Sequence, residues 1–198
     1  MQRRTFIKGT AAAIPASMAL QMLGQRWVFA QSTDFKNPVE VLNYALTLEY
    51  LEAEFYKQGN AANLVGGDVA TLFETIQSDE ETHVVALTDT IKQVGGKPVK
   101  APKVDFGGAF KDEKAFLELA HVFENTGVQA YLGAAPSLFE EKELLAAAAA
   151  IFGVEARHAA VLGDLLGLEA EGGVFMGSTE TPKSKDEVLK AVMPFIKG

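Results

Sequence analysis

Two short motifs on apolar helix faces constrain the fold of this chain more than any other feature. The first is Glu80 and His83, three residues apart, so that on a helix both side chains point the same way. Around this pair, apolar residues recur at steps of three and four, which predicts a buried face: Val69, Phe73, Ile76, Leu87, Ile91 and Val94. A carboxylate and an imidazole are costly to bury without partners, and a metal ion is a partner that suits both.

The same pattern recurs 75 residues later with Glu155 and His158. A second apolar stripe surrounds this pair: Leu144, Ala148, Ile151, Leu162 and Leu165. Each pair also has a glutamate 31 residues upstream, and each of those glutamates has a tyrosine seven residues further on: Glu49 with Tyr56, and Glu124 with Tyr131. Little else is shared, so the repeat is one of a helix face and its polar residues, not of a tandem solenoid unit.

Capping and breaking residues predict where the helices begin and end. Four long helices are expected within 37–58, 68–94, 112–135 and 141–166, and a short one within 184–195. The residues expected to cap helix N-termini are Asn37, Asp68, Asp112 and Ser184. Residues 59–67 are expected to form a loop, and Pro136 is expected to end the third helix.

Loop lengths predict the topology of this all-α chain. Short loops join the first helix to the second and the third to the fourth, so each pair should be an antiparallel hairpin. Residues 97–111 have no helical period, and at roughly 3.3 Å per residue they could run the length of a bundle. A crossover of that kind relates the two halves by a pseudo-twofold axis perpendicular to the bundle, which brings both repeated motifs to one central site.

This set of residues resembles the ligand set of the ferritin-like di-metal carboxylate superfamily, in which two helices each supply a Glu and two others each supply Glu-x-x-His. The resemblance covers about residues 37–167, and all six ligand positions match: Glu49, Glu80, His83, Glu124, Glu155 and His158. It implies a ferritin-like four-helix bundle with a long crossover between helices two and three. It also implies two iron or manganese ions, with Glu80 and Glu155 bridging and the other four residues terminal. The sequence of residues 46–56 is most similar to that of exported bacterial ferritin-like proteins related to plant desiccation-related proteins.

Two further polar residues share the predicted inward faces. Glu52 lies one turn after Glu49, where it is either an extra ligand or neighbouring carboxylate, or a solvated residue at the edge of the face. His121 precedes Glu124 by three residues and could orient it, or be a surface or capped core histidine.

The tyrosines and the charges beside the first motif have simpler interpretations. Tyr56 and Tyr131 are either redox or hydrogen-bonding groups, or core residues whose hydroxyls are bonded; we favour the second. Asp79 and Glu81 flank the motif but point elsewhere on the helix, so both are expected to be surface charge.

Composition excludes several functions. The chain has a net charge of −8, and without the basic residues 1–30 it would be more acidic still, which argues against nucleic-acid binding. It contains no cysteine, so a disulfide, a thiolate nucleophile, a Cys-ligated zinc and an iron–sulfur or rubredoxin centre are excluded within this chain.

The N-terminus reads as an export signal. Arg3 and Arg4 precede an Ala-rich stretch of weak hydrophobicity that is shorter than the roughly 20 residues needed to cross a bilayer, and Val28-Phe29-Ala30 offers a cleavage site. The segment resembles a twin-arginine translocation signal, although Gln2 departs from the usual Ser or Thr; the alternative is an uncleaved basic anchor. The expected organisation is a signal peptide at 1–30, a linker at 31–36, the bundle at 37–167 and an extension with a short helix at 168–198.

The function expected first is that of an exported di-iron or di-manganese oxidoreductase that acts on peroxide or dioxygen and protects against oxidative or drying stress. Iron binding or storage without turnover, and an envelope bundle with a passive or relic site, remain open, as does a homo-oligomer. Export to the periplasm or cell envelope would involve the membrane only through the signal. The extension should pack on the bundle through its apolar residues: Val188, Leu189, Val192 and Met193.

Overall fold

The computed structural model describes residues 35–197, so the predicted signal peptide lies outside the described residues. Four long helices make up most of this range: α2 (Pro38–Ala61), α3 (Gly67–Gln93), α4 (Glu113–Ala134) and α5 (Lys142–Leu165). The smaller elements are β1 (Lys103–Val104), the 3-10 turns η1 (Ala135–Leu138) and η2 (Met193–Phe195), the short helix α6 (Lys185–Val192) and β2 (Ile196–Lys197). The prediction of an all-α ferritin-like bundle is confirmed.

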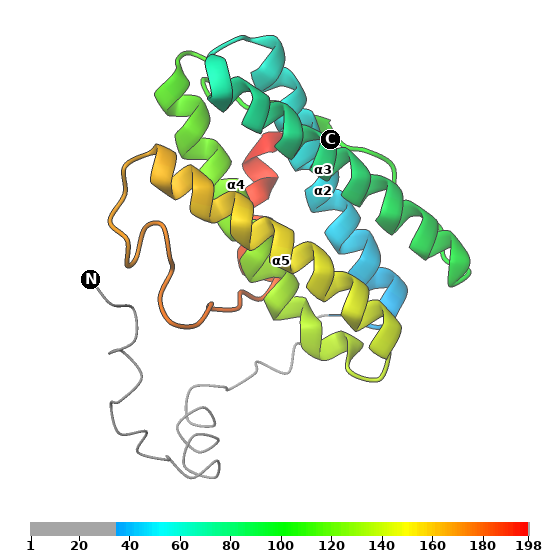
Figure 1. The fold of residues 1–198 in the computed structure, drawn as a ribbon. Helices are drawn as coiled ribbons and strands as arrows, with labels where there is room; N and C mark the ends of the chain where they lie inside the picture. The colour runs from blue at the N-terminus through cyan, green and yellow to red at the C-terminus, as the bar shows by residue number, and fades with distance from the viewer. Residues whose placement is uncertain (1–34, 198) are drawn as a thin grey trace, which may run out of the picture. The chain divides into compact units, whose positions relative to one another are not determined.

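The long helices form two hairpins that pack against each other (Figure 1). Helix α2 packs along α3, α4 packs along α5, and α2 also meets α4, whereas α3 and α5 make hardly any close backbone contact. The connection between the hairpins holds β1, which pairs antiparallel with β2 in the register Lys103↔Lys197 and Val104↔Ile196. This small ribbon, which ties the C-terminus to the crossover, was not predicted.

Side-chain caps define three of the helix starts as predicted. Asn37 accepts from the backbone N–H of Glu40, Asp112 accepts from that of Ala115, and Ser184 forms a full capping box. The predicted cap by Asp68 is wrong, because α3 begins at Gly67 after an N-cap glycine that has no side chain to offer. Asp68 instead lies in the first turn, where its charge favours the positive end of the helix dipole.

Helix α2 also runs further than expected, through Gly59 to Ala61. The ring of Phe116 explains this glycine, because a Cβ on Gly59 would lie only 2.2 Å from it. Gly59 therefore marks a close helix contact and not the start of a loop.

One end of the bundle is packed with aromatic rings. Phe55 is fully buried, and four phenylalanine rings lie with their centroids 5.1 to 5.4 Å from its own: Phe106, Phe110, Phe116 and Phe123. Such tilted and edge-on pairs are favourable beyond the area they bury.

The C-terminal segment packs on the bundle as expected, mainly against α4. Val188 and Val192 are buried, but Met193 is 53% exposed, so its predicted contribution to the packing is wrong. Among the described residues one helix, α5, is long and apolar enough to cross a membrane by length and composition alone. Its Glu155 and His158 are nevertheless buried at the centre of the bundle.

Candidate metal centre

The structure brings all six predicted ligand residues together in the middle of the bundle. Helices α2 and α4 each contribute one carboxylate, and α3 and α5 each contribute a carboxylate and an imidazole, as the 3.6-residue period requires. The four carboxylates, of Glu49, Glu80, Glu124 and Glu155, are fully buried. His83 and His158 are buried as well, each 7% exposed.

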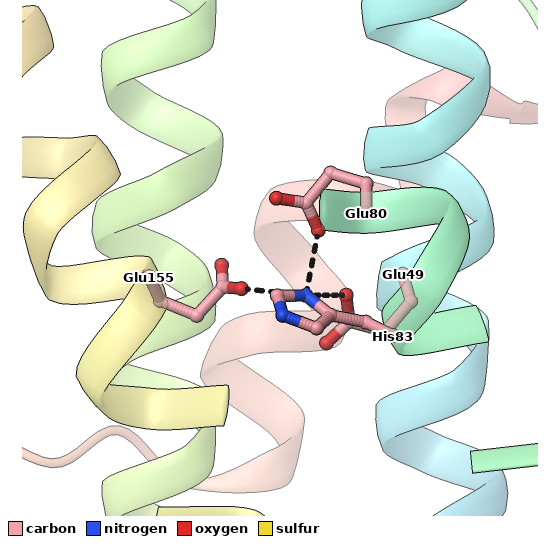
Figure 2. A group of neighbouring side chains, drawn as sticks. All are labelled: Glu49, Glu80, His83 and Glu155. Atoms are coloured by element: carbon pink, nitrogen blue, oxygen red, sulfur yellow. Dashed lines mark hydrogen bonds and ion pairs between the residues drawn. The ribbon is translucent and has the colours of Figure 1, made fainter. Parts of the chain in front are cut away.

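Three carboxylates converge on one nitrogen of His83 (Figure 2). Its Nδ1 lies 3.2 Å from an oxygen of each of them: Glu49 Oε2, Glu80 Oε2 and Glu155 Oε1. A single N–H donates along one direction and cannot serve three oxygens well. Two ligand atoms that bind one cation at about 2.1 Å, with an angle of 90° between the two bonds, lie roughly 3 Å apart. The spacing around His83 Nδ1 is therefore close to that of atoms that share a metal ion.

The second half of the site repeats this arrangement around His158. Its Nδ1 lies 3.0 Å from Glu80 Oε1 and 3.3 Å from Glu124 Oε2, yet it has no hydrogen bond of acceptable geometry. Buried oxygens of Glu80, Glu124 and Glu155 are likewise without a hydrogen-bond partner. A metal-binding pocket contains such ligand atoms, which lie close together without forming hydrogen bonds to one another.

Two groups of candidate donor atoms follow from this geometry, each with its atoms within 4.8 Å of one another. One consists of Glu49, Glu80, His83 and Glu155, and the other of Glu80, Glu124, Glu155 and His158. Glu80 and Glu155 belong to both groups, and they are the residues that the family resemblance implies as bridges.

The raised pKa values of the buried groups also favour the binding of cations. Burial, together with the charge of Glu124, raises the pKa of Glu80 to about 8, and burial raises the pKa of Glu155 strongly as well. Burial alone would lower the pKa of His83, but hydrogen bonds with Glu155, Glu49 and Glu80 outweigh it and raise that pKa to about 12. Glu80, Glu155 and His83 thus retain protons that divalent ions would displace. The residues present fit two hard or borderline divalent ions bound by oxygen and nitrogen.

The two repeat tyrosines orient the carboxylates of Glu124 and Glu49 across the bundle. The Tyr56 hydroxyl donates to Glu124 Oε1 at 2.5 Å, and the Tyr131 hydroxyl donates to Glu49 Oε1. Each tyrosine therefore bonds the glutamate of the other half, which confirms the prediction of packed tyrosines with bonded hydroxyls. The pseudo-twofold relation of the sequence halves is visible in this exchange.

Asp79 corrects a prediction, because it is part of the site and not free surface charge. Its Oδ2 lies 3.2 Å from His158 Nε2, and its side chain is 44% exposed. A carboxylate there holds the Nε2 proton and leaves Nδ1 to face the centre. The repeat could not have revealed it, since Val154 stands at the matching position of the second half. Glu81 is exposed, as predicted, and its carboxylate accepts a hydrogen bond from the Gln77 side chain.

Of the two interpretations of Glu52, the solvated edge residue is wrong, because its side chain is buried beside the centre. It is 3% exposed, its Oε2 has no partner, and burial with the charge of Glu155 raises its pKa. The matching residue of the second half is Gly127, where a Cβ would lie 2.8 Å from Glu155 Oε2 and 3.4 Å from Glu52 Oε1. The glycine leaves room for a fifth carboxylate beside the four.

His121 does not orient Glu124, a role that the Tyr56 hydroxyl takes instead. The His121 Nε2 lies 3.3 Å from the backbone carbonyl of Gly173. The half-buried ring thus links α4 to the loop after α5, in keeping with the capped-histidine interpretation.

A buried group of carboxylates and imidazoles inside an antiparallel four-helix bundle defines a ferritin-like fold able to bind metal. Comparison with known proteins agrees: the chain belongs to the ferritin-like domain family, whose model matches residues 37–168. A similar solved structure is that of ferritin like, diiron-carboxylate proteins from Bacillus anthracis str. Ames. It has a TM-score of 0.57 and 27% sequence identity, over 65% of this chain and 94% of that one. No curated protein matches the chain.

Proposed function

We propose that this chain binds two redox-active ions, iron in the first instance and manganese as the alternative, and acts as an oxidoreductase on peroxide or dioxygen. One observation carries the proposal: six buried donor residues converge in two groups that share Glu80 and Glu155. The description of the similar structure as a diiron-carboxylate protein supports iron. The sequence has no cysteine, so a thiolate iron centre in this chain is not the electron donor, and the proposal assigns that role to a separate reductant.

Each ion would be held by residues that the structure already groups. Glu49 and His83 would hold one, Glu124 and His158 the other, and Glu80 and Glu155 both. Ions bound there would supply Lewis-acid and one-electron redox chemistry toward a peroxide or dioxygen.

The surrounding residues keep the donors in position. The hydroxyls of Tyr56 and Tyr131 fix one oxygen of Glu124 and Glu49, which leaves the other oxygen of each for the centre. Asp79 fixes the ring of His158 through Nε2. The phenylalanine-packed end keeps water away on one side, which strengthens the electrostatic interactions inside.

Metal content is the decisive measurement. We expect about two iron or manganese ions per chain by mass spectrometry, and a large loss in the variant His83→Ala/His158→Ala. As a matched control, His121→Ala removes the third histidine, which lies outside the centre, and should keep both ions. No metal, or zinc that the double variant retains, would overturn the proposal.

Turnover separates an enzyme from the other functions. An oxidoreductase consumes peroxide or dioxygen repeatedly when a reductant is supplied, and the double histidine variant does not. Uptake far above two ions per chain would instead identify an iron store. Metal removal that melts the fold without any associated activity would identify a structural bundle.

We also propose export through the twin-arginine pathway and a role in stress protection outside the cytoplasm, as in proteins related to the desiccation-related type. The support is the pair Arg3 and Arg4 before a short apolar stretch. Arg3→Lys/Arg4→Lys should retain the full-length chain in the cytoplasm, and unchanged export of this variant would contradict the pathway.

A further inference from the structure

An apolar cavity of about 250 Å³ lies in the bundle next to the candidate metal centre. Ala45, Leu87 and Ile151 line it, and each is four residues, about one turn, from a residue of the centre: Glu49, His83 and Glu155 respectively. Because neighbouring helices run in opposite directions, all three steps lead toward the same end of the bundle. Tyr131, which bonds Glu49, is also part of the wall. The cavity and the centre are thus adjacent layers.

The sequence repeat explains why this layer is hollow. At the opposite end of the bundle, Phe55 and Phe73 are fully buried. The offset of 75 residues places Ala130 and Ala148 at the matching positions, and both line the cavity. Two aromatic rings of the packed end therefore have only methyl groups as counterparts here.

The wall of the cavity offers almost nothing polar to a ligand. Seven alanines line it: Ala45, Ala86, Ala130, Ala134, Ala147, Ala148 and Ala150. The Thr90 hydroxyl donates to the Ala86 carbonyl at 2.8 Å, and the Tyr131 hydroxyl donates to Glu49. Tyr44 also contributes to the wall, and its hydroxyl is buried. A polar ligand would lose most of its hydrogen bonds with water here, so the wall favours apolar molecules.

The cavity opens to the surface between α3 and α5. Ala86 on α3 and Ala147 and Ala150 on α5 line it and are exposed. These two helices make hardly any close backbone contact, so the bundle does not close over the opening. A small molecule can enter here without unfolding a helix.

We propose that this cavity binds a small apolar organic molecule, a ring system or short alkyl chain, with one end beside Tyr131 and the metal centre. An apolar cavity of about 150 Å³ takes up benzene, so the larger volume here has room for roughly ten heavy atoms. A polypeptide segment fits less well, because its backbone would bring unpaired polar groups into the alanine-lined wall. This binding site goes beyond the metal chemistry and does not depend on it.

Equilibrium dialysis of the full chain against naphthalene, which has ten carbon atoms, tests the proposal. We expect saturable uptake of one naphthalene per chain. Ala148→Phe, which restores the residue found at the matching position of the packed end, should weaken the uptake at least tenfold. Ala147→Phe at the opening should do the same without needing room in the core. Ala149→Phe is the matched control, since this alanine is exposed and does not line the cavity.

No saturable uptake by the wild-type chain, or uptake that Ala147→Phe and Ala148→Phe both leave unchanged, overturns the proposal. Sedimentation velocity on the same proteins tests whether a second copy of the chain occupies the cavity instead. A wild-type oligomer that takes up no naphthalene and dissociates in Ala147→Phe assigns the cavity to a second copy of the chain, which also overturns it. Dialysis measures neither metal content nor turnover. Its result can therefore be interpreted even if the metal proposal fails.

Discussion

Removal of the Asp79 carboxylate should loosen one of the two bound ions and spare the other. Asp79 bonds His158 of the centre, through Oδ2 and Nε2 at 3.2 Å. His158 belongs to the group that contains Glu124, whereas His83 belongs to the group that contains Glu49. The matching residue beside His83 is Val154, which cannot bond an imidazole. The two halves of the centre therefore depend differently on residue 79.

The size of the effect follows from the contact. Carboxylates that hold a metal-binding histidine typically contribute about 10- to 100-fold in metal affinity. The Asp79 side chain is 44% exposed, and water screens its charge, so the lower part of that range applies. We expect Asp79→Ala to lower the affinity for one of the two ions by about tenfold. Asp79→Asn should weaken it less, because its amide oxygen can still accept the Nε2 proton.

Competition with a chelator, followed by the metal content of the protein, measures both ions in one experiment. In Asp79→Ala the release should split into two steps, one displaced to lower chelator concentration and one at the wild-type position. Glu81→Gln is the matched control, since Glu81 lies two residues away, is exposed and bonds Gln77, which lies outside the centre. Equal loosening of both ions, or an effect no larger than that of Glu81→Gln, would refute the reasoning.

Three further predictions concern the surroundings of the centre. Tyr56→Phe leaves a buried oxygen of Glu124 without its donor and should lower the free energy of unfolding by about 1–3 kcal/mol in chemical denaturation; an unchanged midpoint would contradict the bond. In the metal-free chain the pKa of Glu80 is raised from 4.5 to about 8 by burial and by Glu124, so the folded state binds more protons than the unfolded state over this interval. The free energy of unfolding should therefore fall by a few kcal/mol between pH 5 and pH 8, at about 1.4 kcal/mol per unit of pKa shift, and Glu80→Gln should flatten this fall. Gly127→Ala would place a Cβ 2.8 Å from Glu155 Oε2, so metal affinity measured by chelator competition should drop at least tenfold, and wild-type affinity would show that Glu155 can shift without cost.

Local rules predicted most of the helices because capping involves neighbours in sequence. Asn37, Asp112 and Ser184 each cap through residues three positions away, so their role is visible in the chain alone. The errors occurred where a distant residue decides. Gly59 was predicted to begin a loop, but the ring of Phe116 from another helix fills the space above it.

The features of the site were also predictable only where neighbours in sequence determine them. The faces that carry Glu49 and Tyr56 were predictable, because helical period and burial set them. Which tyrosine bonds which glutamate was not, since the pairing crosses from α2 to α4 and is fixed by how the hairpins dock. Asp79 was missed because it points off the inward face of α3 and reaches the site only where α5 packs nearby.

The sequence by itself determined the helices, their inward faces and the six polar residues on those faces, three in each half, because these follow from periodicity and repeat spacing. Only the tertiary structure decided that Asp79 and Glu52 join the centre and that an apolar cavity adjoins it. The physical reason is that contacts between helices depend on packing distances. A ring at Phe55 and a methyl group at Ala130 are both simply apolar in a sequence pattern, yet one fills its layer and the other leaves room beside the metal centre.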